Sequence, residues 1–293
     1  MGAADVVPGV SGGTIAFISG IYDLLLESIR RINPTLIGML RRDGLLSVWQ
    51  HINGTFLVTL LAGIATSFLS LARLITYLLE FHPIPLWSFF FGLILISIVH
   101  IGKEVGGAKP SNIAAAVLGI GLAYLITAAN PLALDPTPVN VVLGGMIAIC
   151  AMILPGISGS FILLLLGLYV PIIGAVKELD LTIIGLFLSG AVLGLLSFSH
   201  VLSYLLKHFR GVTLSFLCGL MIGTLNKVWP WKQVLTTRIN SSGQQVPLTE
   251  QALSPWQFAE ITGQQPQILL ALACMVFGFG LVWALERYAA NNQ

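Results

Sequence analysis

The sequence has 293 residues, of which 56% are apolar and only 9% are charged, and its mean hydropathy is +0.92. Because a soluble domain typically carries about 25% charged residues, this composition argues against a soluble fold and predicts an all-α integral membrane protein. The net charge of +2 leaves no cluster of Lys and Arg that could neutralise the phosphates of a nucleic acid, so we expect no nucleic-acid partner.

The first predicted element is the uncharged segment 6–22, which contains the motif PGVSGGT. A helix needs about 20 apolar residues to cross a bilayer, and this segment is shorter than that. Its proline breaks a helix and its glycines let the chain turn, so we interpret it as the second arm of a re-entrant hairpin whose first arm is missing. Free N–H groups at this turn would suit an anion, and the candidate ligands are Ser11, Gly12, Gly13 and Thr14.

A basic, partly amphipathic stretch follows at 30–42, and then the long apolar stretches begin. Six of them are long enough, or nearly long enough, to cross the bilayer as helices. They are 54–79, 84–99, 111–134, 181–206, 211–226 and 266–285. The polar stretch 227–265 is predicted to be a loop whose tryptophans rest at the membrane interface.

A long uncharged run, 136–176, lies between the third and fourth of these spans and contains the motif PGISGS. The run is long enough to enter the membrane, turn and return to the same side. We therefore predict a broken helical hairpin, because proline and glycine interrupt the run near its middle. The candidate anion ligands at this second turn are Ser158, Gly159 and Ser160.

The chain repeats itself. Segment 4–22 matches 151–169 at a constant offset of 147, and both share Pro, Gly, Ser, Gly and a terminal Gly-x-Tyr. Further matches within the spans have an offset of 127, and the basic stretch accounts for the difference between the two offsets. We therefore predict two repeats, 1–134 and 135–293, each built from one hairpin and three transmembrane helices.

The distribution of Lys and Arg predicts the orientation of the repeats. If each hairpin returns to its own side, nine of these residues lie on one face and four on the other, so the first face is predicted to be cytoplasmic. Three crossings in a repeat then place the second repeat upside down relative to the first. The first hairpin would enter from the cytoplasm and the second from outside, where the loop 227–265 would also lie. Inverted repeats with interrupted helices are typical of secondary transporters.

Few ionisable residues fall within or beside the spans, and such residues indicate functional sites. The offset of 127 aligns Arg73 with His200 and His100 with Lys227. In inverted repeats, Arg73 and Lys227 would lie near the outer face, and the two histidines near the inner face. Arginine offers a fork that suits phosphate, and histidine can release an anion by changing its protonation. The alternative is that Arg73 snorkels and the other three are ordinary interface residues.

Asp5 stands just before the first motif, and Met152 is its counterpart in the second repeat. Asp5 either takes up a proton during transport or caps a helix at the membrane surface. Asp5 and His200 are the candidates for proton coupling. The three cysteines each stand alone in an apolar run, which is typical of neither a disulfide framework nor a metal site. We predict no metal and no cofactor.

At these motifs the sequence resembles a family of bacterial polytopic membrane proteins, long catalogued as a domain of unknown function and now described as undecaprenyl-phosphate translocases, called PopT. The resemblance rests on ADVVPGVSGGTIAF at 4–17, LPGISGSFILLLLGLY at 154–169 and LNKVWPWK at 225–232, and it covers essentially the whole chain. Members usually have a further helix before the first motif.

The resemblance implies a multi-pass protein of the bacterial cytoplasmic membrane that returns the C55 isoprenoid monophosphate from the outer to the cytoplasmic leaflet for cell-envelope synthesis. A phosphate headgroup cannot cross hydrocarbon unaided, whereas the lipid tail can stay in the bilayer. Under this hypothesis Arg73 and Lys227 receive the phosphate outside, the two Ser-Gly turns hold it at the midplane, and His100 and His200 pass it inward.

Two other functions stay open. The same architecture would support a secondary transporter of a small soluble anion. A membrane phosphatase acting on the diphosphate form of the carrier is less favoured, because hydrolysis needs an acid/base partner or a metal-binding carboxylate cluster and none stands beside Ser11 or Ser158. We therefore predict a transporter and not an enzyme. The oligomeric state is open, with a homodimer as one option.

Overall fold

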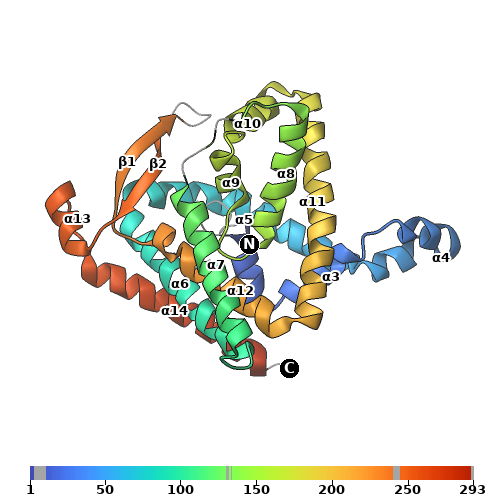
Figure 1. Cartoon of the computed structure of the whole chain (residues 1–293), viewed down its shortest axis with the longest axis horizontal. Coiled ribbons are helices and arrows are strands. Elements are labelled where there is room, and N and C mark those ends of the chain that lie inside the picture. The colour runs from blue at the N-terminus through green and yellow to red at the C-terminus, as the bar shows by residue number, and fades with distance from the viewer. Residues whose placement is uncertain (3–10, 130–131, 133, 240–244, 292–293) are drawn as a thin grey trace.

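The computed structural model describes residues 1–2, 11–129, 132, 134–239 and 245–291, and these are mostly helical (Figure 1). Within the described residues, five helices are long and apolar enough to cross a membrane. They are α5 (Gly54–Phe81), α6 (Pro83–Glu104), α7 (Pro110–Ala128), α11 (Leu181–His208) and α12 (Arg210–Val228). The sixth predicted span lies in α14 (Ile268–Asn291), whose apolar part is shorter. Each of the six predicted spans therefore forms a helix over most of its described length.

The run 136–176 folds as a broken set of helices. These are α8 (Pro138–Ile153), α9 (Gly159–Leu165) and α10 (Tyr169–Glu178), and the axes of α9 and α10 meet at 111°. Thr137 caps the start of α8, because its side chain accepts a hydrogen bond from the backbone N–H of Asn140. The chain turns after α8 at Gly156, whose φ of +88° is in the region that favours glycine.

The first repeat has a matching short helix, α2 (Gly12–Ile18), followed by α3 (Tyr22–Arg30). Residues 3–10 lie outside the described residues, so Asp5 and the start of the predicted first hairpin are not described. The basic stretch then continues into α4 (Thr35–His51), which projects from the side of the molecule (Figure 1).

Several elements recur at the two offsets found in the sequence. The bounds of α2 and α9 are related by the offset of 147, and those of α5 and α11 by the offset of 127. Packing recurs as well, because α6 lies along α14 and its counterpart α12 lies along α7. The opposite orientation of the two repeats in a membrane stays a prediction.

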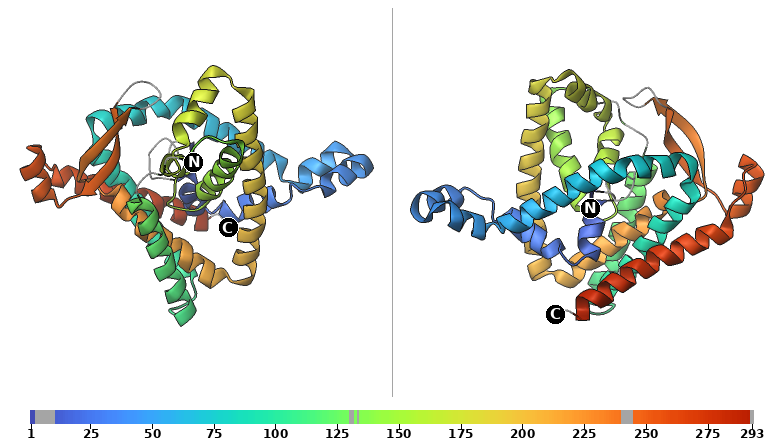
Figure 2. Two further views of the ribbon diagram at one scale, coloured as in Figure 1. Left: turned by 45° about the horizontal axis from the view of Figure 1, so that its top comes forward. Right: turned by 180° about the vertical axis from the view of Figure 1, so that it is seen from behind.

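The core lies around α6 and α12. In each of them 61% of the apolar stretch is buried, whereas the corresponding share is 6% for α5 and 11% for α11. The helix α5 crosses the face of the molecule that Figure 2 shows from behind, and its surface is largely exposed. The helices α6 and α12 are thus central and pack beside the segments that contain the motifs, while α5 and α11 lie at the outside of the molecule.

The predicted polar loop contains a β-hairpin, β1 (Lys232–Ile239) and β2 (Gln245–Ala252), which pair antiparallel. A short helix, α13 (Pro255–Thr262), follows, and Ser254 and Gln257 form a capping box at its start. The prediction that the tryptophans of this loop rest at the membrane interface stays a prediction, and Trp231 is covered by protein. Its side chain is 3% exposed and its indole donates a hydrogen bond to the Pro266 carbonyl, because the hairpin folds back onto the helices.

Candidate functional site

The two motifs meet at a direct contact between the repeats. The Ser11 hydroxyl accepts a hydrogen bond from the Gly13 backbone N–H (3.0 Å) and donates one to the Met152 carbonyl (2.9 Å). The Gly156 backbone N–H donates to the hydroxyl oxygen of Thr14 (3.0 Å). Ser11 and Thr14 are buried. We call this contact of 11–14 with 152–156 the motif junction.

Close packing at the motif junction extends to the neighbouring residues. The Tyr22 hydroxyl donates a hydrogen bond to the Ile153 carbonyl (3.1 Å). A side chain at Gly13 would place its Cβ closer than 3.0 Å to the same carbonyl oxygen, a separation that atoms do not reach without a shift of the backbone. The sequence therefore uses glycine at position 13 because the two backbones touch there.

The serines of the two motifs have different surroundings. The Ser11 hydroxyl bonds to the backbone just before the second motif, at Met152, and the Thr14 hydroxyl bonds to the backbone within it, at Gly156, so in this structure they hold the repeats together. In the second motif, the Ser158 and Ser160 hydroxyls bond to each other at 2.9 Å, and Ser160 is exposed. The second motif thus presents the accessible hydroxyl.

A narrow cavity lies beside the second motif and has a volume of about 10 Å³, the room of one water molecule. Gly156 and Ser158 line it from the motif, Phe161 lines it from α9, and Thr224 and Lys227 line it from α12. A phosphate needs more space than this. The cavity is therefore closed in this structure and has to widen before it could take an anion.

Lys227 is held at this cavity by aromatic and acidic partners. Its ammonium lies 5.3 Å from the centre of the Phe161 ring and 3.2 Å from the Glu250 carboxylate on β2. Lys232 on β1 approaches the same carboxylate at 3.4 Å, and its ammonium lies 3.6 Å from the centre of the Trp87 ring. One carboxylate is thus shared by two lysines.

Lys232 is the most deeply enclosed member of this group, with 6% of its side chain exposed. Burial lowers its pKa to about 8, and the nearby charge of Lys227 acts in the same direction, while Glu250 opposes the shift. We refer to Lys227, Lys232 and Glu250 as the lysine cluster. With both lysines protonated the cluster carries a net charge of +1, and loss of the Lys232 proton would make it neutral. Lys227 is the member that lines the cavity.

The other predicted cations lie elsewhere. Arg73 is exposed on α5 and His200 is exposed on α11, where its Nδ1 lies 2.7 Å from the Leu196 carbonyl oxygen. His100 is half-buried on α6, with Nε2 at 3.6 Å from the Glu104 carboxylate. Of the four predicted cations, Lys227 is the one that lines the cavity at the second motif.

Sequence reasoning misses two members of the lysine cluster. Lys232 belongs to the segment LNKVWPWK but falls in the predicted polar loop, and Glu250 stands in a stretch without a motif. Their positions depend on the β-hairpin, which returns residue 250 to residue 232. The available signal for a strand is the enrichment of β1 in β-branched residues, which are Val234, Thr236, Thr237 and Ile239.

Comparisons with known proteins agree with one another. The model of a family described as undecaprenyl phosphate translocase-like matches residues 1–246. A protein of Vibrio cholerae serotype O1 named polyprenyl-phosphate transporter is 60% identical over 289 residues, which cover 99% of this chain and 94% of that protein. A Staphylococcus aureus protein with the same name is 33% identical over 249 residues, covering 78% and 83% of the two chains. No solved structure matches significantly.

Proposed function

Because this chain belongs to the undecaprenyl phosphate translocase-like family, we propose that it is a transporter that carries a polyprenyl phosphate across the membrane. The substrate is undecaprenyl phosphate, moved from the outer to the cytoplasmic leaflet of the bacterial cytoplasmic membrane so that cell-envelope synthesis can use it again. The phosphate is the part that needs a path, because charge is costly to move through hydrocarbon, whereas the apolar tail stays in lipid.

The observation that carries this proposal is the motif junction beside Lys227. It brings the start of α2 in the first repeat into contact with the break between α8 and α9 in the second, next to a cation and an accessible serine. Backbone groups at the breaks of interrupted helices serve as ion and anion sites in transporters, and movement of one repeat against the other opens such a site to each side in turn. The small volume of the cavity fits a closed state of that cycle.

The lysine cluster suits the first capture of the headgroup. A phosphate monoester accepts charge-assisted hydrogen bonds as the Glu250 carboxylate does, and it carries more charge. In our proposal the phosphate competes with Glu250 for Lys227 and Lys232, and then reaches Ser158 and Ser160 as the cavity widens. Arg73, exposed on α5, is an additional cation for the headgroup on the outer side.

For the cytoplasmic half of the path, we keep the residues that the sequence analysis predicts. His100 and His200 pass the phosphate toward the cytoplasm, and Asp5 and His200 are the candidates for coupling to protons. Ser11, Gly12, Gly13 and Thr14 form part of the wall of the path. When the repeats separate, the Ser11 and Thr14 hydroxyls lose their hydrogen bonds to Met152 and Gly156.

The test is the amount of undecaprenyl phosphate exposed on the cell surface, measured with an externally added ligand of its headgroup. Cells that lack this protein and any redundant translocase should accumulate the lipid outside, and the wild-type protein should reverse this. At equal expression, Lys227→Gln and Arg73→Ala should restore the wild-type level poorly. Lys177→Gln, a lysine on the same predicted face but outside the cavity, should restore it fully.

The outcomes separate the candidate functions. An unchanged surface level in depleted cells would contradict lipid transport and favour a small soluble anion, which solute-uptake assays would then identify. Loss of function in Lys227→Gln with normal function in Arg73→Ala would keep the transport proposal and remove Arg73 from the outer site.

A further inference from the structure

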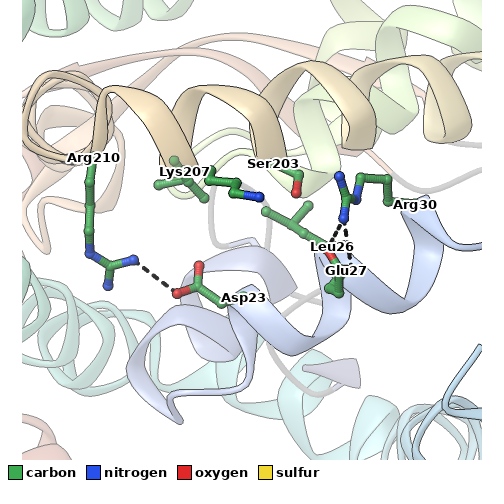
Figure 3. Close-up of a pocket in the computed structure, with 8 residues that line it drawn as sticks. Asp23, Leu26, Glu27, Arg30, Ser203, Lys207 and Arg210 are labelled. Atoms are coloured by element: carbon green, nitrogen blue, oxygen red, sulfur yellow. Dashed lines mark hydrogen bonds and ion pairs between the residues drawn. The ribbon is translucent and has the colours of Figure 1, made fainter.

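A second, larger cavity lies between the two repeats, away from the lysine cluster (Figure 3). Its volume is about 340 Å³. One wall is α3, which contributes Asp23, Leu26, Glu27 and Arg30, and the other wall is the end of α11 with Ser203, Leu206 and Lys207, followed by Arg210. Each repeat therefore supplies one wall. No motif or span prediction pointed to this place.

The carboxylates of the cavity are already paired. Arg210 lies 3.1 Å from Asp23 and 2.7 Å from Glu104, and thus ties α12 to α3 and α6. Glu27 pairs with Arg30 at 2.8 Å and with Arg31, and these arginines hold the pKa of Glu27 below its usual value. Both acids that line the cavity are therefore matched by arginines.

One cation of the lining is not neutralised. Three cations and two carboxylates line the cavity, which leaves one positive charge. Over the described part of the chain, Lys207 forms neither a hydrogen bond nor an ion pair. Figure 3 shows its side chain extending into the space between Arg210 and Arg30. The excess charge of the cavity therefore belongs to Lys207.

A hydroxyl stands one helical turn before this lysine. Most helical serines here donate a hydrogen bond to a carbonyl in the preceding turn, as Ser197, Ser199 and Ser215 do. Ser203 makes no such bond, nor any other to a described residue, although it lies at the cavity. A free ammonium and a free hydroxyl at positions i+4 and i face the same cavity, and both can donate to an anion.

The cavity adjoins an apolar, exposed face of the same helix. Tyr204 is exposed and lies next to Lys207 around α11, and the exposed Val201 and Leu205 continue this apolar surface further round the helix, away from the cavity. A molecule with an anionic head and an apolar tail could place its head in the cavity while its tail lies along this face. A soluble anion would contact only Lys207 and Ser203 and would leave the apolar surface unused.

We propose that the cavity between α3 and α11 binds the phosphate monoester headgroup of a lipid, with Lys207 and Ser203 as its ligands. This inference rests on the proposed function and deepens it. In the predicted orientation the cavity lies near the cytoplasmic face, so it holds the headgroup after its passage and before release. A phosphate monoester also carries enough charge, about −1.5 to −2 at pH 7, to draw Arg30 from Glu27.

The experiment places a single reporter in the cavity. Ser203→Cys in the full-length protein, reconstituted in nanodiscs, is labelled with a small maleimide, and the labelling of the protein without this substitution is subtracted. A polyprenyl phosphate should slow the labelling of residue 203 by roughly tenfold, the effect expected of a charge-assisted contact. Inorganic phosphate and the corresponding polyprenol should leave the rate unchanged.

The matched pair is Lys207→Gln and Lys103→Gln, each added to Ser203→Cys. Lys103 is an exposed lysine on the same predicted face but outside the cavity. Protection should disappear in Lys207→Gln and persist in Lys103→Gln. Equal protection in both variants, or equal protection by the polyprenol, would overturn the assignment of Lys207 as a phosphate ligand.

The failure of this inference differs from the failure of the proposed function. If the lipid phosphate gives no protection although the same preparation moves it across proteoliposomes, the cavity is not a headgroup site and the transport proposal stands. Protection by inorganic phosphate as strong as that by the lipid would overturn the lipid headgroup as the ligand and favour a soluble anion.

Discussion

At the scale of single residues, the fold changes the protonation of Lys232. Burial lowers its pKa from 10.5 to about 8, so between these two pH values the folded chain releases a proton that the unfolded chain keeps. Stability rises with pH wherever the unfolded state binds more protons. The free energy of unfolding should therefore increase between about pH 8 and pH 10.5, by up to about 1.4 kcal/mol per pH unit.

The measurement is the thermal unfolding midpoint of the detergent-solubilised protein between pH 7.5 and 10, compared with Lys232→Met. Wild type should gain stability relative to this variant as the pH rises. In Glu250→Gln the gain should begin at lower pH, because the carboxylate is one of the groups that raises the pKa of Lys232. A constant difference between wild type and Lys232→Met across this range would show that Lys232 does not titrate there.

The sequence identifies some of these residues and not others, for a physical reason. Lys227 is found because the duplication aligns it with His100 and because it ends an apolar helix. Glu250 and Lys232 come together through a strand pairing that is invisible in helix periodicity. Arg73 and His200 share a register position, yet the structure leaves both exposed, since register alone does not say which face of a helix is covered.

At the scale of elements, the start of α2 is fixed by its contact with the end of α8. A Cβ at position 13 would lie closer than 3.0 Å to the Ile153 carbonyl oxygen, so Gly13→Ala should push the two motifs apart. We expect this variant to lose most of its transport and to destabilise the protein by roughly 1 to 3 kcal/mol, as overpacking of a closely packed site does. Transport in reconstituted vesicles and the thermal midpoint would measure the two effects.

Gly63→Ala on α5 is the matched control. A Cβ there would meet no atom within 4 Å, and alanine favours a helix over glycine by about 1 kcal/mol. Gly63→Ala should therefore retain transport and unfold at the same or a higher temperature. If Gly13→Ala behaved in the same way, the close approach at the motif junction would not be needed for function.

Apolar length predicts the helices well, because a span must satisfy its own backbone within the bilayer. It also predicts the interruption of 136–176, where proline and glycine stand in an otherwise apolar run. What it misses are elements held by tertiary contacts. The β-hairpin packs against the helices through Trp231, and the cavity between α3 and α11 forms from helix faces that are far apart in the sequence.

At the scale of the whole molecule, the two candidate phosphate sites lie at different places along the structure. Arg210 at the start of α12 lines the cavity that contains Lys207, and Lys227 near the end of α12 lines the other cavity, 17 residues further along or about 26 Å at 1.5 Å per residue. This separation is large enough to place one site near each leaflet of a bilayer whose hydrocarbon core is about 30 Å thick.

The orientation of the chain then decides which site receives the headgroup and which releases it. Single cysteines at Trp256 and at Lys109 test this, because both positions are exposed, one on α13 and the other before α7. The positive-inside distribution predicts that a membrane-impermeant maleimide labels Trp256→Cys in intact cells and labels Lys109→Cys only after permeabilisation. Labelling of both in intact cells would contradict the predicted number of crossings between them. The reverse pattern would place the lysine cluster on the cytoplasmic side, and the cavity at Lys207 would then be the receiving site. The assay that determines the topology therefore also determines the order in which the two sites act.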